Sequence, residues 1–357
     1  MKQRRVTFSD IATAAGVSRA TVSLVLHGSP LIAAETRARV EQQLQTQGYV
    51  YNRAAADLRR RRSSSVAMVI NDLSNPFFAE FAAGVDEALG ATGYVTLLGS
   101  TGESVERQQK VLTSLMEHDP AGIILSPAEG SDSRRLLSVI GAHTPTLVFN
   151  RELPHAQKIV PHWDFLALDN RHGARLATKH LLQLGHRRIA FFGGHADSSS
   201  CSERRKGYRE ALAAAGIVAE PQWLVESAPT RLEAATQTSA LFIRDPVPTA
   251  AVCYNDAVAL GLMLGLAARG RRPGYDFAVT GFDNIPEADV SMPPLTTVAT
   301  DPRACGRRAA ECVLARIHDS DVPVTRMITP VQLVVRASTC PPLRPSGRKP
   351  RAEPIEP

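Results

Sequence analysis

Hydrophobic residues recur at helical spacing on both sides of one glycine near the start of the chain. The residues that show this spacing are Ile11, Ala14, Ala15, Val17, Val22, Val25 and Leu26. Because glycine is unfavourable inside a helix, the pattern predicts two short helices joined by a tight turn at Gly16. Thr7 with Asp10 forms a capping-box pattern for the first helix, and Ser18 is placed to cap the second, over about residues 19–26. The pattern predicts a helix-turn-helix.

From residue 66 onward, the pattern changes to short apolar strands that alternate with amphipathic helices. The predicted strands lie near residues 66–70, 94–98, 122–125, 146–149, 165–168, 189–192, 250–253, 277–280 and 331–335. Several of the helices between them end in glycine, at Gly93, Gly185, Gly216 and Gly270. Such alternation indicates parallel sheets with helices on both faces. Because nine strands are too many for one such sheet of ordinary size, we predict two α/β subdomains.

Charge is unevenly distributed along the 357 residues. Residues 1–62 contain eleven Lys and Arg but four Asp and Glu, a net charge of +7, whereas the whole chain carries +6. A small basic unit on a near-neutral remainder is typical of phosphate binding. A solvated basic tail would have the same composition, but the helical pattern favours a folded nucleic-acid-binding unit.

No secretory or membrane segment is indicated. The charged residues 1–10 are followed by no apolar stretch, and the longest apolar run, residues 257–268, is too short to span a bilayer. We therefore expect a cytoplasmic protein with no membrane contact. The five cysteines are odd in number and show no C-x-x-C pattern, which argues against a disulfide framework or a zinc site.

Three blocks near the N-terminus occur in a specific order: DIATAAGVSRATVS at 10–23, ETRARV at 35–40, and GY with Asn52. They resemble the DNA-binding headpiece of the LacI/GalR family of bacterial transcription regulators. The resemblance implies that the second helix reads bases in a major groove, that a third helix packs on it and that a hinge helix enters the minor groove. It assigns residues 1–50 to the headpiece and residues 51–64 to the hinge helix and linker.

The residues that we expect to bind DNA are Thr7, Ser18, Arg19, Ala20, Thr21, Ser23, Leu24, His27, Asn52, Ala55 and Leu58. Arg19 suits a bidentate contact with guanine, and Thr21 suits a hydrogen bond or a thymine methyl. Leu58, the hinge leucine of the resemblance, suits a wedge in the minor groove, where the bent duplex offsets the cost of unstacking. Leu24 has an alternative interpretation as a core leucine of the headpiece.

Two positions depart from the family pattern. Tyr51 stands where the family usually has proline, and Ala56 stands where many members have arginine. The start of the hinge is therefore less rigid, and one common polar contact is missing. We keep the hinge helix as a prediction.

Later blocks, among them LDNRHGARLATKHLLQLGHRRIAFFGG, CYNDAVALG and VTGFDN, resemble a type I periplasmic-binding-protein fold. In that fold the chain crosses three times between two lobes, and a cleft between the lobes binds a small effector. The resemblance implies an effector-binding and dimerisation domain at 65–338, with lobe one at about 65–168 and 300–328, lobe two at about 169–299 and 329–338, and a disordered tail at 339–357. Within the family, the chain is most similar to maltose-system repressors.

Polar residues gather after the predicted strands, at the edge where open α/β sheets bind ligands. The candidate effector-binding residues are Asp72, Asn75, Phe77, Ser126, Arg151, Arg204, Asn255 and Asp283, of which the resemblance contributes Arg204. Hydroxyl-rich ligands need such donors and acceptors, because an unpaired buried polar group costs about 1–3 kcal/mol. Simpler interpretations stay open: Asn75 as a helix start, Asp256 as a helix cap, Asp283 as a turn, Phe78 as a core aromatic, and Arg151 as an ion pair between lobes.

The chain lacks the sequence motifs of serine hydrolases, zinc proteases, P-loop proteins and dinucleotide-binding enzymes. We therefore expect no catalytic residues, no metal and no cofactor. A solute receptor for a transporter would need a signal peptide and would not need residues 1–62.

The sequence predicts a repressor that acts as a homodimer on pseudo-palindromic operator DNA, in the cytoplasm and on the nucleoid when bound. Its expected effector is a small molecule, a sugar or sugar derivative. A C-terminal tail without leucine heptads favours a dimer over a tetramer. Two alternatives stay open: an activator of the same architecture, and a cytoplasmic sugar-binding sensor with a nonspecific basic arm.

Overall fold

The computed structural model describes residues 6–26, 28–49, 63–153, 156–160, 162–243 and 245–341. The chain forms two compact units, Met1–Ser63 and Ser64–Pro357, and each is described by itself. Most of the predicted hinge helix at 51–64 and of the predicted tail at 339–357 lies outside the described residues.

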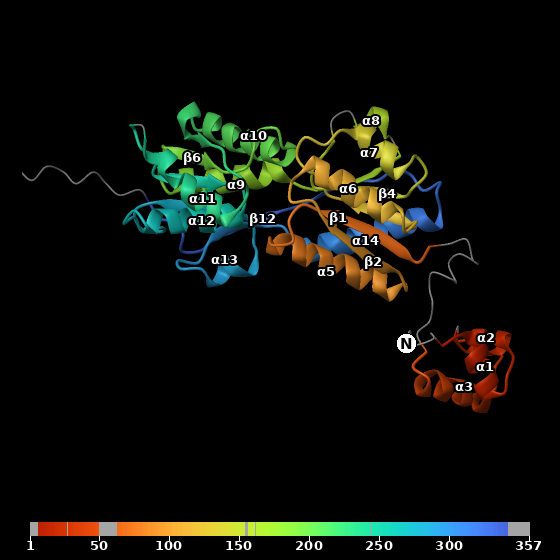
Figure 1. Cartoon of the computed structure of the whole chain (residues 1–357). Coiled ribbons are helices and arrows are strands. Elements are labelled where there is room, and N and C mark those ends of the chain that lie inside the picture. Colours follow the sequence, from red (N-terminus) through yellow and green to blue (C-terminus); the bar gives the residue numbers. More distant parts are fainter. Residues whose placement is uncertain are drawn as a thin grey trace, which may run out of the picture. The chain divides into compact units, whose positions relative to one another are not determined.

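The first unit contains three helices, α1 (Phe8–Ala15), α2 (Arg19–Leu26) and α3 (Ala34–Thr46) (Figure 1). They enclose a small core whose buried members are Ile11, Ala12, Ala15, Val22, Val25 and Val40. Ala14, which we predicted on this buried face, is exposed, and Ala12 is buried instead. The reason is geometric, because residues 11, 12 and 15 share one side of a helix of 3.6 residues per turn.

Local hydrogen bonds fix the ends of these helices as predicted. The Thr7 N–H donates to Asp10 Oδ2 at 2.8 Å, and the Asp10 N–H donates back to Thr7 Oγ1 at 3.4 Å, which completes the capping box. Ser18 Oγ accepts from the Thr21 N–H at 3.1 Å at the start of α2. Gly16 has φ +63°, a left-handed conformation that costs glycine little, and this turn separates the two helices. The predicted helix-turn-helix is confirmed.

The second unit contains two six-stranded sheets, each covered by helices on both faces (Figure 1). Sheet one has the order β11-β5-β4-β3-β1-β2, and every pairing in it is parallel. Its strands are β1 (Ser65–Ile70), β2 (Val95–Ser100), β3 (Gly122–Leu125), β4 (Thr146–Phe149), β5 (Asp164–Leu168) and β11 (Arg326–Thr329). Helices α5 (Pro76–Ala91) and α14 (Pro302–His318) cover one face, and α6 (Val105–Met116), α7 (Ser133–Ile140) and α8 (Ala156–Ile159) cover the other.

Sheet two has the order β12-β10-β9-β8-β6-β7, with one antiparallel pairing, between β10 and β12. Its strands are β6 (Ile189–Phe192), β7 (Leu224–Val225), β8 (Ala250–Cys253), β9 (Ala278–Asp283), β10 (Thr296–Ala299) and β12 (Gln332–Val334). Helices α9 (Asn170–Gln183) and α10 (Ser199–Ala214) lie on one face, and α11 (Arg231–Gln237) and α12 (Asp256–Ala267) lie on the other (Figure 1). A short helix, α13 (Pro286–Val290), follows β9.

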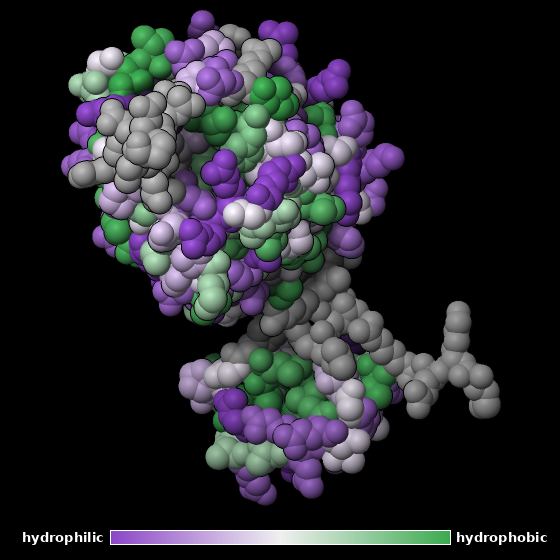
Figure 2. Space-filling view, turned by 90° about the vertical axis from the view of Figure 1, so that its left-hand side faces the viewer, coloured by the Kyte–Doolittle hydropathy of each residue, from purple (hydrophilic) through white to green (hydrophobic). Residues whose placement is uncertain are grey.

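The chain passes between the sheets three times, after β5, after β10 and after β11. We call the two halves lobe one and lobe two, after sheets one and two. The predicted pair of α/β subdomains is therefore confirmed. None of the helices in the described part of the chain is long and apolar enough to cross a membrane. On the side of the second unit that Figure 2 shows, hydrophilic and hydrophobic residues are interleaved.

Four strands begin and end where the sequence predicts, at 122–125, 146–149, 189–192 and 250–253. Strands β7, β10 and β11 were not predicted. The sequence of β10 begins with two threonines, which look polar but are fully buried, and the Thr296 hydroxyl donates to the Arg336 carbonyl at 3.0 Å. Strand β11 lies at the edge of its sheet and is half exposed, so it lacks an apolar run.

Helices α5 and α14 touch backbone to backbone through two glycines. A Cβ atom on Gly84 would lie 2.0 Å from the carbonyl oxygen of Arg303, and one on Gly306 would lie 2.1 Å from that of Phe81. Main-chain atoms cannot rotate away as a side chain does. The contact therefore holds the chain that returns from lobe two against lobe one.

We expect Gly84→Ala to lower the free energy of unfolding of the second unit by about 1–3 kcal/mol, because the added methyl forces the helices apart. Gly90→Ala in the same helix is the matched control, since nothing lies within 4 Å of its Cβ position. Alanine's higher helix propensity should make that variant more stable by up to about 1 kcal/mol. Denaturant unfolding followed by circular dichroism measures both, and equal midpoints for the two variants would contradict the packing argument.

Asp256 is fully buried at the start of α12 and braces the loop after β9. Its carboxylate accepts from the Ile285 N–H at 2.9 Å and from the Thr297 hydroxyl. Burial raises the pKa of Asp256 to about 7, and these donors offset the effect only in part. Asn255, not Asp256, caps α12, because its Oδ1 accepts from the Val258 N–H at 2.9 Å.

The burial of Asp256 makes the free energy of unfolding depend on pH. The pKa of Asp256 is higher in the folded state than in the unfolded state, so the folded state binds the extra proton between about pH 4 and 7. Stability should then fall as pH rises through that window, by about 1 kcal/mol per pH unit for this group. Asp256→Asn should flatten the slope of unfolding free energy against pH, whereas Asp321→Asn on the exposed surface should not. An unchanged slope in Asp256→Asn would rule out the linkage.

Candidate functional site

The outward face of α2 carries the predicted base-reading residues. Arg19, Ala20 and Leu24 are exposed, and Thr21 and Ser23 are half-buried. Leu24 exposes 41% of its surface and takes no part in the buried core of the headpiece. Its alternative interpretation as a core leucine is therefore wrong.

The other predicted DNA-binding residues divide into two groups. Thr7 and Ser18 are exposed at the starts of α1 and α2, where each caps its helix with a side-chain oxygen. Backbone N–H groups at such helix starts suit phosphate oxygens. His27, Asn52, Ala55 and Leu58 lie outside the described residues.

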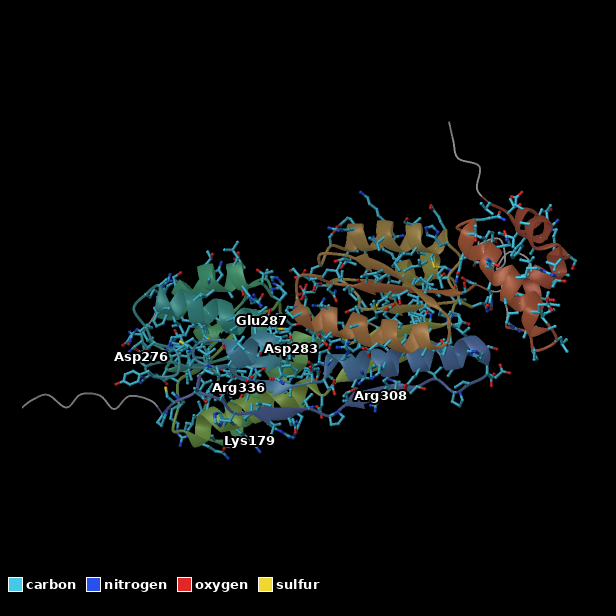
Figure 3. The ribbon with its side chains drawn as sticks, turned by 90° about the horizontal axis from the view of Figure 1, so that it is seen from below. Lys179, Asp276, Asp283, Glu287, Arg308 and Arg336 are labelled. Atoms are coloured by element: carbon cyan, nitrogen blue, oxygen red, sulfur yellow. The ribbon has the colours of Figure 1, made fainter. Side chains whose placement is uncertain are left out.

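A cavity of about 330 Å³ lies between the two lobes and is lined from both. Seven of the eight predicted effector-binding residues line it: Asp72, Asn75, Phe77, Arg151, Arg204, Asn255 and Asp283. Such a volume is at the lower end of the range for small-ligand sites. Figure 3 labels Asp283, on the side of lobe two that faces lobe one.

Ser126 is the predicted residue that does not line the cavity. It is buried directly after β3, and its hydroxyl donates to Asn71 Oδ1. Asn71 in turn donates to Glu103 Oε2 at 3.1 Å and to the Pro127 carbonyl at 3.0 Å. Ser126 therefore supports the cavity wall from behind.

Arg204 organises the lobe-two wall. Its Nε donates to Asn170 Oδ1 at 2.8 Å, and its Nη1 donates to the Tyr254 carbonyl. The guanidinium lies 3.6 Å from the centroid of the Phe282 ring and 4.7 Å from that of Tyr254, a cation–π arrangement. Nη2 is 3.9 Å from Asp283 Oδ1, which leaves room for a ligand hydroxyl to bridge the two groups.

Asp283 and Asn255 complete that wall. Burial raises the pKa of the Asp283 carboxyl well above its usual value, and the charge of Arg204 opposes the shift. Asp283 has φ +121°, an unusual conformation for a residue with a side chain, so its position is set by its surroundings. The Arg336 guanidinium holds the adjacent loop, donating to Asn284 Oδ1 at 2.9 Å and to the Leu295 carbonyl at 2.8 Å.

In the lobe-one wall, Arg151 is bound by carboxylates of its own lobe. Its two Nη atoms donate to the two oxygens of Glu103 at 2.6 and 2.9 Å, and its Nη2 lies 3.6 Å from Glu129 Oε1. The alternative interpretation of Arg151 as an ion pair between lobes is therefore wrong. Its charge faces the cavity already partly neutralised.

Asn75 and two phenylalanines form the apolar end of the same wall. Asn75 Oδ1 accepts from the Phe77 N–H at 3.1 Å and caps α5, so the simpler interpretation of Asn75 as a helix start is confirmed. Phe77 and Phe78 both line the cavity and are largely buried, with Phe77 stacked 6.1 Å from Phe149. They offer a nonpolar surface to one side of a ligand.

Several lining residues were missed by the sequence reasoning, chiefly Glu103, Glu129, Asn150, His195 and Tyr254. Each follows a parallel strand within a few residues, so the strand-end rule points to all of them once the loops are included. Nothing in the sequence pattern ranks them above their neighbours. Among the described residues, no group of three or more histidine, cysteine or acidic side chains is placed to hold a metal ion.

Comparison with known proteins agrees with this geometry. Residues 7–52 match the family of bacterial regulatory proteins called the lacI family, and residues 178–339 match the periplasmic binding protein-like domain. The maltose regulon regulatory protein MalI of Escherichia coli strain K12 is 32% identical over 346 residues, which cover 93% of this chain and 98% of that protein.

Solved structures show the same architecture. The structure of the lac repressor dimer bound to operator and the anti-inducer ONPF matches this chain with a TM-score of 0.81 at 26% identity. The match covers 94% of this chain and 100% of the lac repressor chain. The complex of the transcriptional regulator CelR with cellobiose has a TM-score of 0.70 at 30% identity, with the same coverage of 94% and 100%. The chain belongs to the lacI family of bacterial regulatory proteins.

Proposed function

We propose that this protein is a transcriptional repressor that binds a pseudo-palindromic operator as a homodimer, and that a small ligand in the interlobe cavity controls its operator affinity. One observation carries the proposal: the chain combines an exposed recognition helix with a cavity whose walls come from two lobes. The match of residues 7–52 to the lacI family argues against a merely nonspecific basic arm. MalI and the lac repressor are regulators of transcription, which supports regulation rather than catalysis.

In this proposal, residues 1–50 read the operator and residues 51–64 form the hinge. Arg19, Ala20, Thr21 and Leu24 contact base edges, because they lie on the open side of α2. Thr7, Ser18 and Ser23 position the helix on phosphates, together with Asn52, and His27 belongs to the reading helix. Ala55 and the Leu58 wedge enter the minor groove.

Residues 65–338 bind the effector and dimerise. Lobe one spans about 65–168 and 300–328, and lobe two spans about 169–299 and 329–338. A ligand that contacts both walls of the cavity favours one angle between the lobes over others, and it shifts operator affinity only through that difference, typically about 1–3 kcal/mol. A sugar or sugar derivative suits the polar walls and the phenylalanine pair, and the CelR complex holds cellobiose. As a DNA-binding regulator of transcription, the protein acts in the cytoplasm, and on the nucleoid when it is bound to its operator.

Leu24→Ala tests the reading helix. We expect it to lower affinity for the preferred operator at least tenfold at fixed salt, or to change the preferred sequence, because base contact is lost. Thermal stability should change little, because Leu24 is exposed and is not a member of the headpiece core. Val25→Ala, one residue further on, is the control: it removes two buried methyl groups and should destabilise the headpiece by about 1.5 kcal/mol.

The assay is enrichment of random duplexes by the purified full-length protein, followed by titration of the enriched sequence. Equal operator affinity and sequence preference in Leu24→Ala and the unmodified protein would refute the assignment of α2. Binding that tracks salt alone, with no enriched sequence, would refute specific operator binding altogether.

Asp283→Asn tests the cavity. A panel of sugars is screened for a compound that changes operator affinity at least tenfold in the unmodified protein. In Asp283→Asn we expect that response to be lost, because the buried carboxylate beside Arg204 accepts ligand hydroxyls. Glu220→Gln, exposed on lobe two, should respond normally. A full response in Asp283→Asn would place the effector elsewhere.

A further inference from the structure

Two buried oxygen atoms in the lobe-one wall have no hydrogen-bond donor within the protein, Glu129 Oε1 and Asn150 Oδ1. Both residues line the interlobe cavity, and Asn150 is only 8% exposed. A buried acceptor without a donor is unfavourable. A ligand that brings donors to this place therefore gains affinity from hydrogen bonds that the protein itself does not supply.

The fold brings these acceptors to one edge. Glu129 follows β3 and Asn150 directly follows β4, and β3 and β4 are neighbouring parallel strands. Their carboxyl ends point the same way, so the segments that follow them, which carry Glu129 and Asn150, lie at one edge of the sheet, and both residues line the cavity there. Glu129 and Arg151 also line a wider hollow of about 820 Å³, so this part of the cavity lies where two hollows meet.

Arg151 does not neutralise both of its carboxylate neighbours. It donates to both oxygens of Glu103, at 2.6 and 2.9 Å, whereas 3.6 Å separates it from Glu129 Oε1, too far for a hydrogen bond. The Arg151 guanidinium thus faces two carboxylates, and it interacts more weakly with Glu129 than with Glu103. The Nε of Arg151 has no acceptor in the protein and suits a ligand hydroxyl.

Acidic side chains outnumber basic ones among the residues that line the whole cavity. Four carboxylates line it, from Asp72, Glu103, Glu129 and Asp283. Against them stand two guanidinium groups, of Arg151 and Arg204, and the imidazole of His195. Arg204 already has Asn170 and the Tyr254 carbonyl as partners. A phosphate or carboxylate ligand would lose its hydration here and face acidic groups whose charged forms burial already disfavours at Glu129 and Asp283, whereas an ammonium would favour those charged forms.

We propose that the effector carries a protonated amine beside hydroxyl groups, as an amino sugar does, and that its ammonium donates to Glu129 and Asn150. This inference rests on the proposed function, in which the cavity holds the effector. An ammonium has three donors and no acceptor, which matches two unpaired acceptors and an adjacent excess of carboxylate. A hydroxyl of the same ligand then accepts from Arg151 Nε.

The pKa of Glu129 agrees with this assignment. Burial raises the pKa of Glu129, and the nearby charge of Arg151 counteracts the shift only in part. A carboxylate that lacks donors behaves in this way. A bound ammonium would supply both a charge and donors, so amine binding lowers that pKa and favours release of any proton that Glu129 holds.

The test uses the purified full-length protein and isothermal titration calorimetry with matched sets of one scaffold: glucosamine, glucose and glucose 6-phosphate, and the corresponding galactose and mannose compounds. In at least one set, the amine should bind ten times more tightly than the neutral sugar, and the phosphate should bind more weakly than both. A neutral sugar that matches its amine, a phosphate that binds best, or no binding by any amine would overturn the proposal.

Glu129→Gln tests the residue itself, because glutamine keeps the shape and removes the charge. The amine's preference over its neutral counterpart should fall to about twofold or less, whereas Glu117→Gln, exposed on lobe one, should keep the full preference. A full preference in Glu129→Gln would overturn the assignment. Operator titrations on the same samples separate the two proposals: if a neutral sugar changes operator affinity and no amine does, effector control stands and the amine inference fails.

Discussion

The structure of the candidate site depends first on the burial of one charged side chain, Arg204. A guanidinium that is removed from water needs partners for its donors and its charge, and these come from three separate places in lobe two. They are the start of α9 through Asn170, the end of β8 through Tyr254, and the end of β9 through Phe282 and Asp283. The ends of neighbouring elements are thereby fixed to one another, and the lobe-two wall exists before any ligand arrives.

Lobe one also buries a guanidinium, but that guanidinium has different partners. Arg151 is also buried, but it is bound mainly by Glu103, and Glu129 and Asn150 keep acceptors that the protein does not satisfy. The lobe-two wall therefore supplies partners for its buried guanidinium, whereas the lobe-one wall keeps hydrogen-bond acceptors that only a ligand can pair. A ligand between them gains most from the contacts that lobe one lacks, so the chemistry of lobe one selects the ligand more sharply than that of lobe two.

Much of this could be predicted from the sequence, because the rules involved are local. Thr7, Asp10 and Ser18 form helix caps through local hydrogen bonds. Seven of the eight predicted effector-binding residues line the cavity; six of these seven were predicted from their positions after strands, and Arg204 from the family resemblance. The prediction for Ser126 was wrong, because its position after a strand does not tell whether the side chain faces the cavity or lies behind its wall. The roles of Leu24 and Arg151 could be decided only from the tertiary structure. By sequence, Leu24 could have been a core residue, and Arg151 could have formed an ion pair with either lobe. The buried threonines of β10 were missed because polarity along the chain does not reveal a hydrogen-bond partner 40 residues away.

The energetics of a switch connect these observations. A ligand changes operator affinity only by binding one lobe arrangement better than another, and a coupling of about 1–3 kcal/mol suffices. A single charge-assisted hydrogen bond contributes about 1.5–3 kcal/mol, which is the same magnitude. Contacts to the prebuilt lobe-two wall form in any arrangement and so add affinity without coupling. Contacts that need both walls at once form in one arrangement only. In the proposed function, a ligand that pairs with the unsatisfied acceptors of lobe one and also with Arg204 and Asp283 of lobe two would bind one lobe arrangement best, and this difference would change operator affinity.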